Sequence, residues 1–119
     1  MSYVDGYVIP VQKKDVKAYV KMALWGRKTW MKAGALQYFE CVGHDLKIQP
    51  GCGVSFKKLA KLKPTETVFF SFIIYRNKAH RDAVNKKVFA EMSKGEMPAK
   101  MPFDMKRMTF GGFKTLVQG

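Results

Sequence analysis

Four polar residues in otherwise apolar, β-rich segments could form a small-ligand site: Asp5, Tyr7, Glu40 and Arg107. Alternate residues of a strand share a face, so Asp5 and Tyr7 would point to the same side of the first predicted strand. We expect Asp5 and Arg107 to meet across neighbouring first and last strands, with Tyr7 and Glu40 nearby. Acidic, basic and phenolic groups that converge in an apolar cavity are typical of a site that binds a small ligand.

Several roles remain open for these side chains, and the catalytic residues are left unassigned. A carboxylate buried in such a cavity could have a shifted pKa and act as a base. Alternatively, the charged groups form a structural ion pair or lie at the rim of a dimer, because buried charges are normally paired whatever their role. Lys106 and Arg107 could bind an anionic group. The alternative, which we favour, is that Asp104 caps a turn and orients Arg107.

Metal and cofactor sites are not predicted. Cys41 and His44 form one half of a zinc-ligand pattern, and no second pair of ligands has a suitable spacing. Gly111 and Gly112 lack the spacing and the following helix of a phosphate-binding loop. The glycine pair instead indicates a bulge or a close approach of strands.

The apolar run over residues 68–75 is the element that must position the candidate site. Apolar or aromatic side chains occupy almost every position of this strand, so both of its faces need a cover. We expect two helices to cover one face and a second copy of the chain to cover the other. Ser71 shares a face with Phe69, Ile73 and Tyr75, and we expect that face to look into a cavity between two sheets.

Hydrophobic periodicity predicts four strands and two long helices. The strands are expected over residues 3–11, 36–42, 67–75 and 106–117, and the helices over residues 13–33 and 79–92. A short helical turn is expected over residues 54–62, and Gly34 is expected to end the first helix. The predicted fold class is α+β: a ferredoxin-like βαββαβ chain, with a four-stranded antiparallel sheet and two helices on one face.

Length and composition indicate one soluble domain over residues 1–119, with 47% hydrophobic and 26% charged residues. No apolar run approaches the roughly 20 residues of a membrane span, and the N-terminus has no secretory-signal pattern. Two cysteines are too few for a disulfide framework. We therefore expect a cytoplasmic protein without a membrane partner.

The net charge is +13, from 22 Lys and Arg residues against 9 Asp and Glu residues. Such a charge favours binding to polyanions or acidic ligands. The lysines are spread along the chain rather than gathered in one run, which favours a generally basic, soluble surface over a dedicated site for polyanions or acidic ligands.

Several motifs carry a resemblance to a known family. They are YVDGYV at residues 3–8, GAL at residues 34–36 followed by Glu40 and Cys41, and FDMKRMTFGGF at residues 103–113. These motifs resemble the YbaA-like family of small bacterial proteins of unknown function, over nearly the whole chain. The resemblance implies a dimeric α/β barrel, in which two sheets face each other and enclose a small cavity. The wider superfamily includes cofactor-independent monooxygenases, decyclases, isomerases and haem-dependent enzymes, and the fold alone does not choose among them.

Three functions are consistent with the sequence. The first is a homodimer that binds a small molecule in a barrel cavity between the sheets, with or without an enzymatic reaction. The second is a basic nucleic-acid-binding module, since RNA-recognition domains share the βαββαβ order and stack bases on sheet aromatics; the third strand, however, lacks their Lys/Arg-Gly-aromatic opening. The third is a protein whose basic helix over residues 13–32 docks on an acidic partner.

Overall fold

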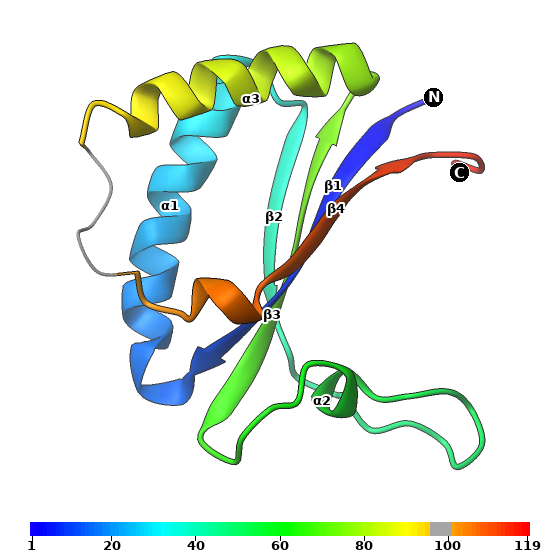
Figure 1. Cartoon of the computed structure of the whole chain (residues 1–119). Helices are drawn as coiled ribbons and strands as arrows, with labels where there is room; N and C mark the ends of the chain where they lie inside the picture. The colour runs from blue at the N-terminus through cyan, green and yellow to red at the C-terminus, as the bar shows by residue number, and fades with distance from the viewer. Residues whose placement is uncertain (96–100) are drawn as a thin grey trace.

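The computed structural model describes residues 1–95 and 101–119, which form the predicted βαββαβ arrangement. The sheet has four antiparallel strands in the order β2-β3-β1-β4, and α1 and α3 lie on the same side of it (Figure 1). The main elements are β1 (Tyr3–Gln12), α1 (Val16–Ala33), β2 (Gln37–Val42), β3 (Glu66–Tyr75), α3 (Lys78–Met92) and β4 (Thr109–Lys114). Three shorter helical segments are η1 (Lys13–Asp15), α2 (Phe56–Leu59) and η2 (Met105–Arg107).

The β1–β3 ladder is the longest pairing of the sheet and runs from Tyr3 opposite Tyr75 to Gln12 opposite Glu66. β3 starts at Glu66, one residue before the predicted strand.

Among the described residues, no helix is long and apolar enough to cross a membrane.

Local chemistry explains where α1 ends and where α3 begins. Gly34 adopts a left-handed conformation with φ of 116° after α1, which glycine reaches without a steric penalty. At the start of α3, the Asn77 side chain accepts a hydrogen bond of 2.8 Å from the backbone N–H of His80. Gly26 lies inside α1 because a Cβ there would come 2.6 Å from the Tyr38 hydroxyl of β2. The close approach of α1 to the sheet therefore requires this glycine.

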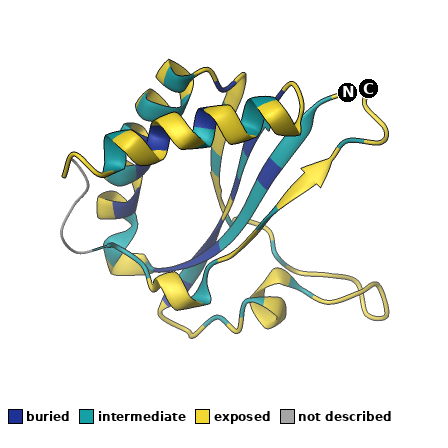
Figure 2. Cartoon of the chain, turned by 45° about the horizontal axis from the view of Figure 1, so that its top comes forward, coloured by how far each residue is buried: buried dark blue, intermediate teal, exposed yellow. Residues whose placement is uncertain are grey.

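The core lies between the helices and the face of β3 that carries Phe69, Ser71, Ile73 and Tyr75 (Figure 2). Phe69 packs in one cluster with Tyr19 and Ala23 of α1. Ile73 and Tyr75 pack in a second cluster that includes Val84 and Val88 of α3. The prediction that this face looks into a cavity between two sheets is therefore wrong: it faces the helices of its own chain.

The opposite side of the sheet, here called the outer face, carries no long helix. Its apolar residues follow from the strand register and include Val4, Val8, Phe39, Phe70, Phe72, Ile74 and Phe113. Phe39 and Phe72 stack with ring centroids 4.6 Å apart, and Phe113 remains 61% exposed. The segment that contains α2 reaches only one end of this face, where Phe56 packs edge-on against Phe70.

Arg107 does not meet Asp5, which corrects the predicted pairing. The last strand begins only at Thr109, because Asp104 caps η2 by accepting a 3.0 Å hydrogen bond from the backbone N–H of Lys106. β1 and β4 are neighbours as expected, but the residue opposite Asp5 is Gly112. Arg107 therefore lies before the strand and outside its ladder.

Arg107 instead forms a structural ion pair at the start of β3. Its guanidinium donates to both carboxylate oxygens of Glu66, at 2.5 and 3.0 Å, and to the backbone carbonyls of Ala60 and Lys61. The Glu66 carboxylate also accepts a 2.8 Å hydrogen bond from the backbone N–H of Lys63. One buried carboxylate thus ties η2 to the turn that precedes β3.

The Glu66–Arg107 pair predicts a pH-dependent contribution to stability. Hydrogen bonds from Arg107 hold the pKa of Glu66 below its usual range, although burial opposes this shift. A lowered folded-state pKa stabilises the protein above the unfolded value of about 4.3, and that stabilisation is lost as the pH falls further. Glu66→Gln should therefore lower the free energy of unfolding by about 2 kcal/mol at neutral pH, and by much less near pH ~3. Urea unfolding at both pH values measures the difference.

The matched control is Glu91→Gln, which removes an exposed ion pair with Lys94 and should change stability little at either pH. A Glu66→Gln effect of the same size at both pH values would contradict the assigned role of the pair.

Candidate functional site

A cavity of about 350 Å³ lies between the helix-facing side of the sheet, the two long helices and residues 101–108. Its lining is mostly apolar and rich in aromatic side chains, including Trp25, Trp30, Phe89, Phe103 and Phe110. Of the four predicted site residues, Asp5, Tyr7 and Glu40 line it, whereas Arg107 does not. The cavity is formed within one chain, and not between two sheets as the sequence led us to expect.

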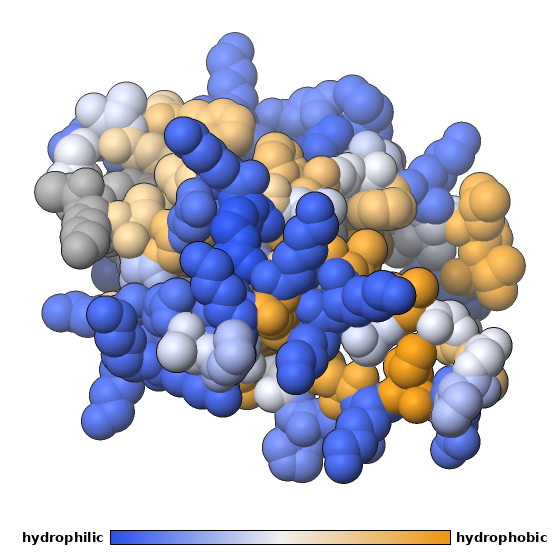
Figure 3. All heavy atoms as spheres, turned by 60° about the horizontal axis from the view of Figure 1, so that its bottom comes forward, coloured by the Kyte–Doolittle hydropathy of each residue, from blue (hydrophilic) through white to orange (hydrophobic). Residues whose placement is uncertain are grey.

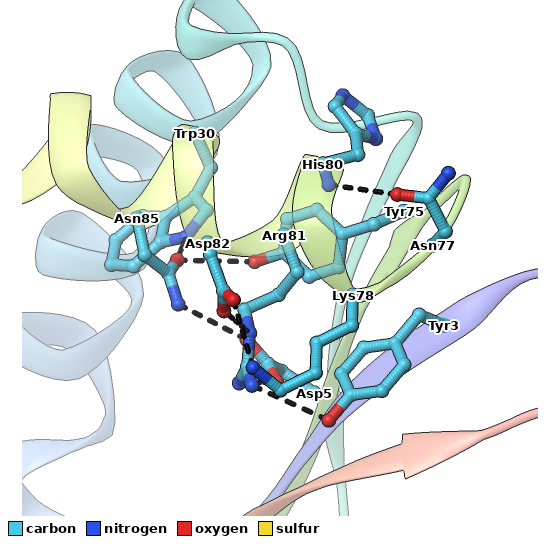
Figure 4. Close-up of polar contacts among 10 residues, drawn as sticks. All are labelled: Tyr3, Asp5, Trp30, Tyr75, Asn77, Lys78, His80, Arg81, Asp82 and Asn85. Carbon is cyan, nitrogen blue, oxygen red and sulfur yellow. Dashed lines mark hydrogen bonds and ion pairs between the residues drawn. The ribbon is translucent and has the colours of Figure 1, made fainter.

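Asp5 connects the centre of the sheet to α3 (Figure 4). It is only 4% exposed, and its two carboxylate oxygens accept hydrogen bonds from Arg81, at 2.8 Å, and from Asn85, at 3.4 Å. Arg81 and Asn85 lie four residues apart on one face of α3, so both reach the same carboxylate. Arg81 therefore supplies the cation that the sequence analysis assigned to Arg107.

Arg81 is held in place by further contacts. Its guanidinium lies 4.9 Å from the ring centroid of Tyr3 and donates to the Tyr3 hydroxyl at 3.3 Å, while Nε donates to Asp82 at 2.8 Å. The Tyr3 side chain can lie here because residue 112 of the neighbouring strand β4 is glycine. A Cβ atom at Gly112 would come 2.9 Å from the Tyr3 ring. The second glycine of the Gly111–Gly112 pair thus serves a close approach, as expected.

Asn85 joins three elements of the fold. Its side-chain oxygen accepts hydrogen bonds from Trp30 Nε1 of α1, at 3.1 Å, and from the Tyr75 hydroxyl of β3, at 3.3 Å. Its amide nitrogen donates to Asp5 of β1. The oxygen and the nitrogen of the Asn85 amide are consequently both engaged within the protein.

Glu40 plays the corresponding role for α1. Its carboxylate accepts hydrogen bonds from the Tyr19 hydroxyl of α1 and the Tyr38 hydroxyl of β2, both at 2.7 Å, and from the Ser71 hydroxyl of β3. Burial, followed by the negative charge of Glu40, raises the pKa of both Tyr19 and Tyr38. Both phenols therefore remain protonated and donate to the carboxylate.

Tyr7 lies on β1 between the two carboxylates. It is opposite Ser71 in the β1–β3 ladder and stacks on Phe110 of β4 at a centroid distance of 5.8 Å. Burial, and then the charge of Asp5, raises the pKa of its phenol. The predicted convergence of Asp5, Tyr7 and Glu40 on one face of the sheet is thereby confirmed.

Three polar residues of the cavity were not predicted from the sequence: Tyr19, Arg81 and Asn85. Arg81 and Asn85 are four residues apart on a helix that was expected to cover the sheet. This spacing, which puts both side chains on one face of the helix, was the signal that could have identified them. Within residues 1–95 and 101–119, no group of three or more His, Cys, Asp or Glu residues could hold a metal ion. The arrangement is therefore a preformed apolar pocket with two internally paired carboxylates.

Comparisons with known proteins agree with the resemblance to the YbaA-like family. Residues 2–105 match the model of a family described as "Protein of unknown function (DUF1428)". The chain is 39% identical over 119 residues to "Uncharacterized protein YbaA" of Escherichia coli (strain K12) and to the protein of that name in Shigella flexneri, with 98% of each chain covered. A solved structure, "De novo designed protein Foldit4", aligns over 99% of this chain with 13% identity and a TM-score of 0.44. The chain therefore belongs to the DUF1428 family, which includes proteins similar to YbaA.

Proposed function

We propose that this protein is a homodimer that binds a small molecule in the cavity of each protomer. The observation that carries the proposal is the cavity itself. Its volume of about 350 Å³ falls within the range of small-molecule sites, and its lining combines many apolar side chains with a few fixed polar groups. Packed protein interiors contain few voids larger than a water molecule, so a hollow of this size is better explained as a binding site than as imperfect packing.

The outer face of the sheet supports the dimer. Among the residues of the paired strands that point to the outer face, the only charged one is Glu66, which is paired with Arg107, although the chain as a whole carries +13. Exposed, contiguous apolar patches mark interaction sites, and two copies that meet through largely apolar faces keep their basic surfaces apart. The dimeric α/β barrel implied by the resemblance also supports a second copy at this face.

Nucleic-acid binding, the alternative that the net charge favours, has less support in the geometry. RNA-recognition sheets combine stacking aromatics with cationic side chains that contact phosphates. The outer face offers the aromatics, but none of the outward-pointing residues of its paired strands, polar ones included, is Lys or Arg. On the face shown in Figure 3, many hydrophilic side chains project outward, and hydrophobic patches lie between them.

The cavity predicts saturable binding of a neutral, naphthalene-sized compound. Trp25 and Trp30, the two tryptophans of the chain, both line the cavity, so quenching of their fluorescence by acetylnaphthalene reports binding. Ala23→Leu adds three carbons to a buried cavity-lining position of α1 and should weaken binding about tenfold, because overpacking costs about 1–3 kcal/mol.

Ala18→Leu makes the same chemical change on the exposed side of α1 and should leave the affinity unchanged. Equal effects of the two substitutions, or an absence of saturable quenching in the parent protein, would contradict binding in the cavity.

The outer face predicts a dimer that a single charge disrupts. Phe70 is 46% exposed on this face, whereas Ile73 is 3% exposed in the core beneath the helices. Phe70→Asp should weaken dimerisation by about 2–4 kcal/mol while the chain stays folded, because it places a charge in an apolar interface. Ile73→Asp should unfold the chain, because it buries an unpaired charge. Sedimentation velocity and circular dichroism distinguish the two outcomes.

Leu24→Asp is the control for the dimer, because Leu24 is 51% exposed on α1, away from the outer face. This variant should dimerise like the parent protein. A parent protein that sediments as a monomer over a wide concentration range would contradict the proposed assembly.

A further inference from the structure

We propose that the cavity selects a neutral, largely apolar molecule with one hydrogen-bond acceptor, such as a ketone, and that the Tyr7 hydroxyl donates to that acceptor. This inference rests on the proposed function, because it names the class of ligand for the same cavity. Three properties of the lining lead to it: its charge, the engagement of its carboxylates and the free hydroxyl of Tyr7.

The charge of the cavity is opposite in sign to that of the protein. Its charged lining residues in the described part of the chain are Asp5, Glu40 and Arg81, which leave one net negative charge when all three are ionised. A negatively charged ligand would have to lose its hydration and enter this field. The overall charge of +13 is therefore a poor guide to what enters the cavity.

The two carboxylates are also unavailable to a cationic ligand. Asp5 is held by Arg81 and Asn85, and Glu40 by three hydroxyl groups. A cation that bound either carboxylate would displace these donors, and a buried donor left without a partner is destabilising. A neutral ligand leaves both networks intact.

Tyr7 differs from the other tyrosines of the chain. The hydroxyls of Tyr3, Tyr19, Tyr38 and Tyr75 each take part in a hydrogen bond within the protein. For Tyr7, the fifth tyrosine, the described residues provide none.

The Tyr7 hydroxyl must therefore be accessible. No fully buried side-chain nitrogen or oxygen in the described part of the chain lacks a hydrogen-bond partner. Because Tyr7 lines the cavity, its unpaired hydroxyl is best placed to meet a molecule that enters there.

The protonation state of Tyr7 decides what it can bind. Burial and the nearby charge of Asp5 raise the pKa of the phenol, so it stays protonated at neutral pH and is able to donate. The complementary group on the ligand is consequently an acceptor. Phe110, stacked on the Tyr7 ring, and the aromatic walls of the cavity fit an apolar body next to that acceptor.

Three naphthalene compounds of similar shape test the proposal: acetylnaphthalene, isopropenylnaphthalene and naphthoate. The first is a neutral ketone, the second lacks the acceptor, and the third is an anion. Quenching of Trp25 and Trp30 gives the affinity of each compound for the parent protein and for Tyr7→Phe. We expect the ketone to bind the parent protein most tightly. Tyr7→Phe should weaken ketone binding about three- to tenfold and leave binding of isopropenylnaphthalene unchanged.

Tyr75→Phe is the matched control. It removes a hydroxyl that already donates to Asn85, so it should lower the melting temperature without changing the preference for the ketone. Tyr7→Phe, which removes no internal hydrogen bond, should melt like the parent protein. Unchanged ketone affinity in Tyr7→Phe, or tightest binding of naphthoate, would overturn the inference and leave the cavity as a binding site. Failure of all three compounds to quench would overturn both the inference and the proposed function.

Discussion

The rest of the structure depends on the hydrogen bonds of two carboxylates on the inner, helix-facing side of the sheet. Each carboxylate is hydrogen-bonded to a different helix. Asp5 of β1 accepts hydrogen bonds from Arg81 and Asn85 of α3, and Glu40 of β2 accepts one from Tyr19 of α1. A carboxylate removed from water needs partners in good geometry. Each helix is thereby held at a distance set by polar side chains, and the space left between helices and sheet is the cavity.

The residues that hold the cavity in shape are therefore different from the residue that we propose contacts a ligand. The donors that engage the carboxylates leave little capacity for a ligand, so the polar residues that first suggest chemistry mainly hold the cavity in shape. Tyr7, which lies between the two carboxylates with an unpaired hydroxyl, is the residue available for recognition. The largely apolar outer face of the same sheet meets a second copy in the proposed assembly, so one sheet serves both binding and dimerisation.

The strand and helix order follows from the sequence because the two helices have a clear hydrophobic period, β-rich apolar runs mark the strands, and Gly34 marks the end of the first helix. The face assignment of β3 failed because the odd and even positions of residues 68–75 are equally apolar, so the pattern cannot tell which side the helices cover. Arg107 was misplaced because the capped turn at Asp104 delays β4. Contacts between α3 and the sheet, such as that of Arg81 with Asp5, depend on how the helix packs, which local sequence does not specify.

A crystal structure of the protein with acetylnaphthalene bound tests the central claim most directly. The account predicts the naphthalene ring between the inner face of the sheet and the helices, with the ketone oxygen within hydrogen-bonding distance of the Tyr7 hydroxyl. The contacts of Asp5 with Arg81 and of Glu40 with Tyr19 should be unchanged. A ligand bound only on the outer face, or a cavity closed by side chains with both carboxylate networks rearranged, would contradict it.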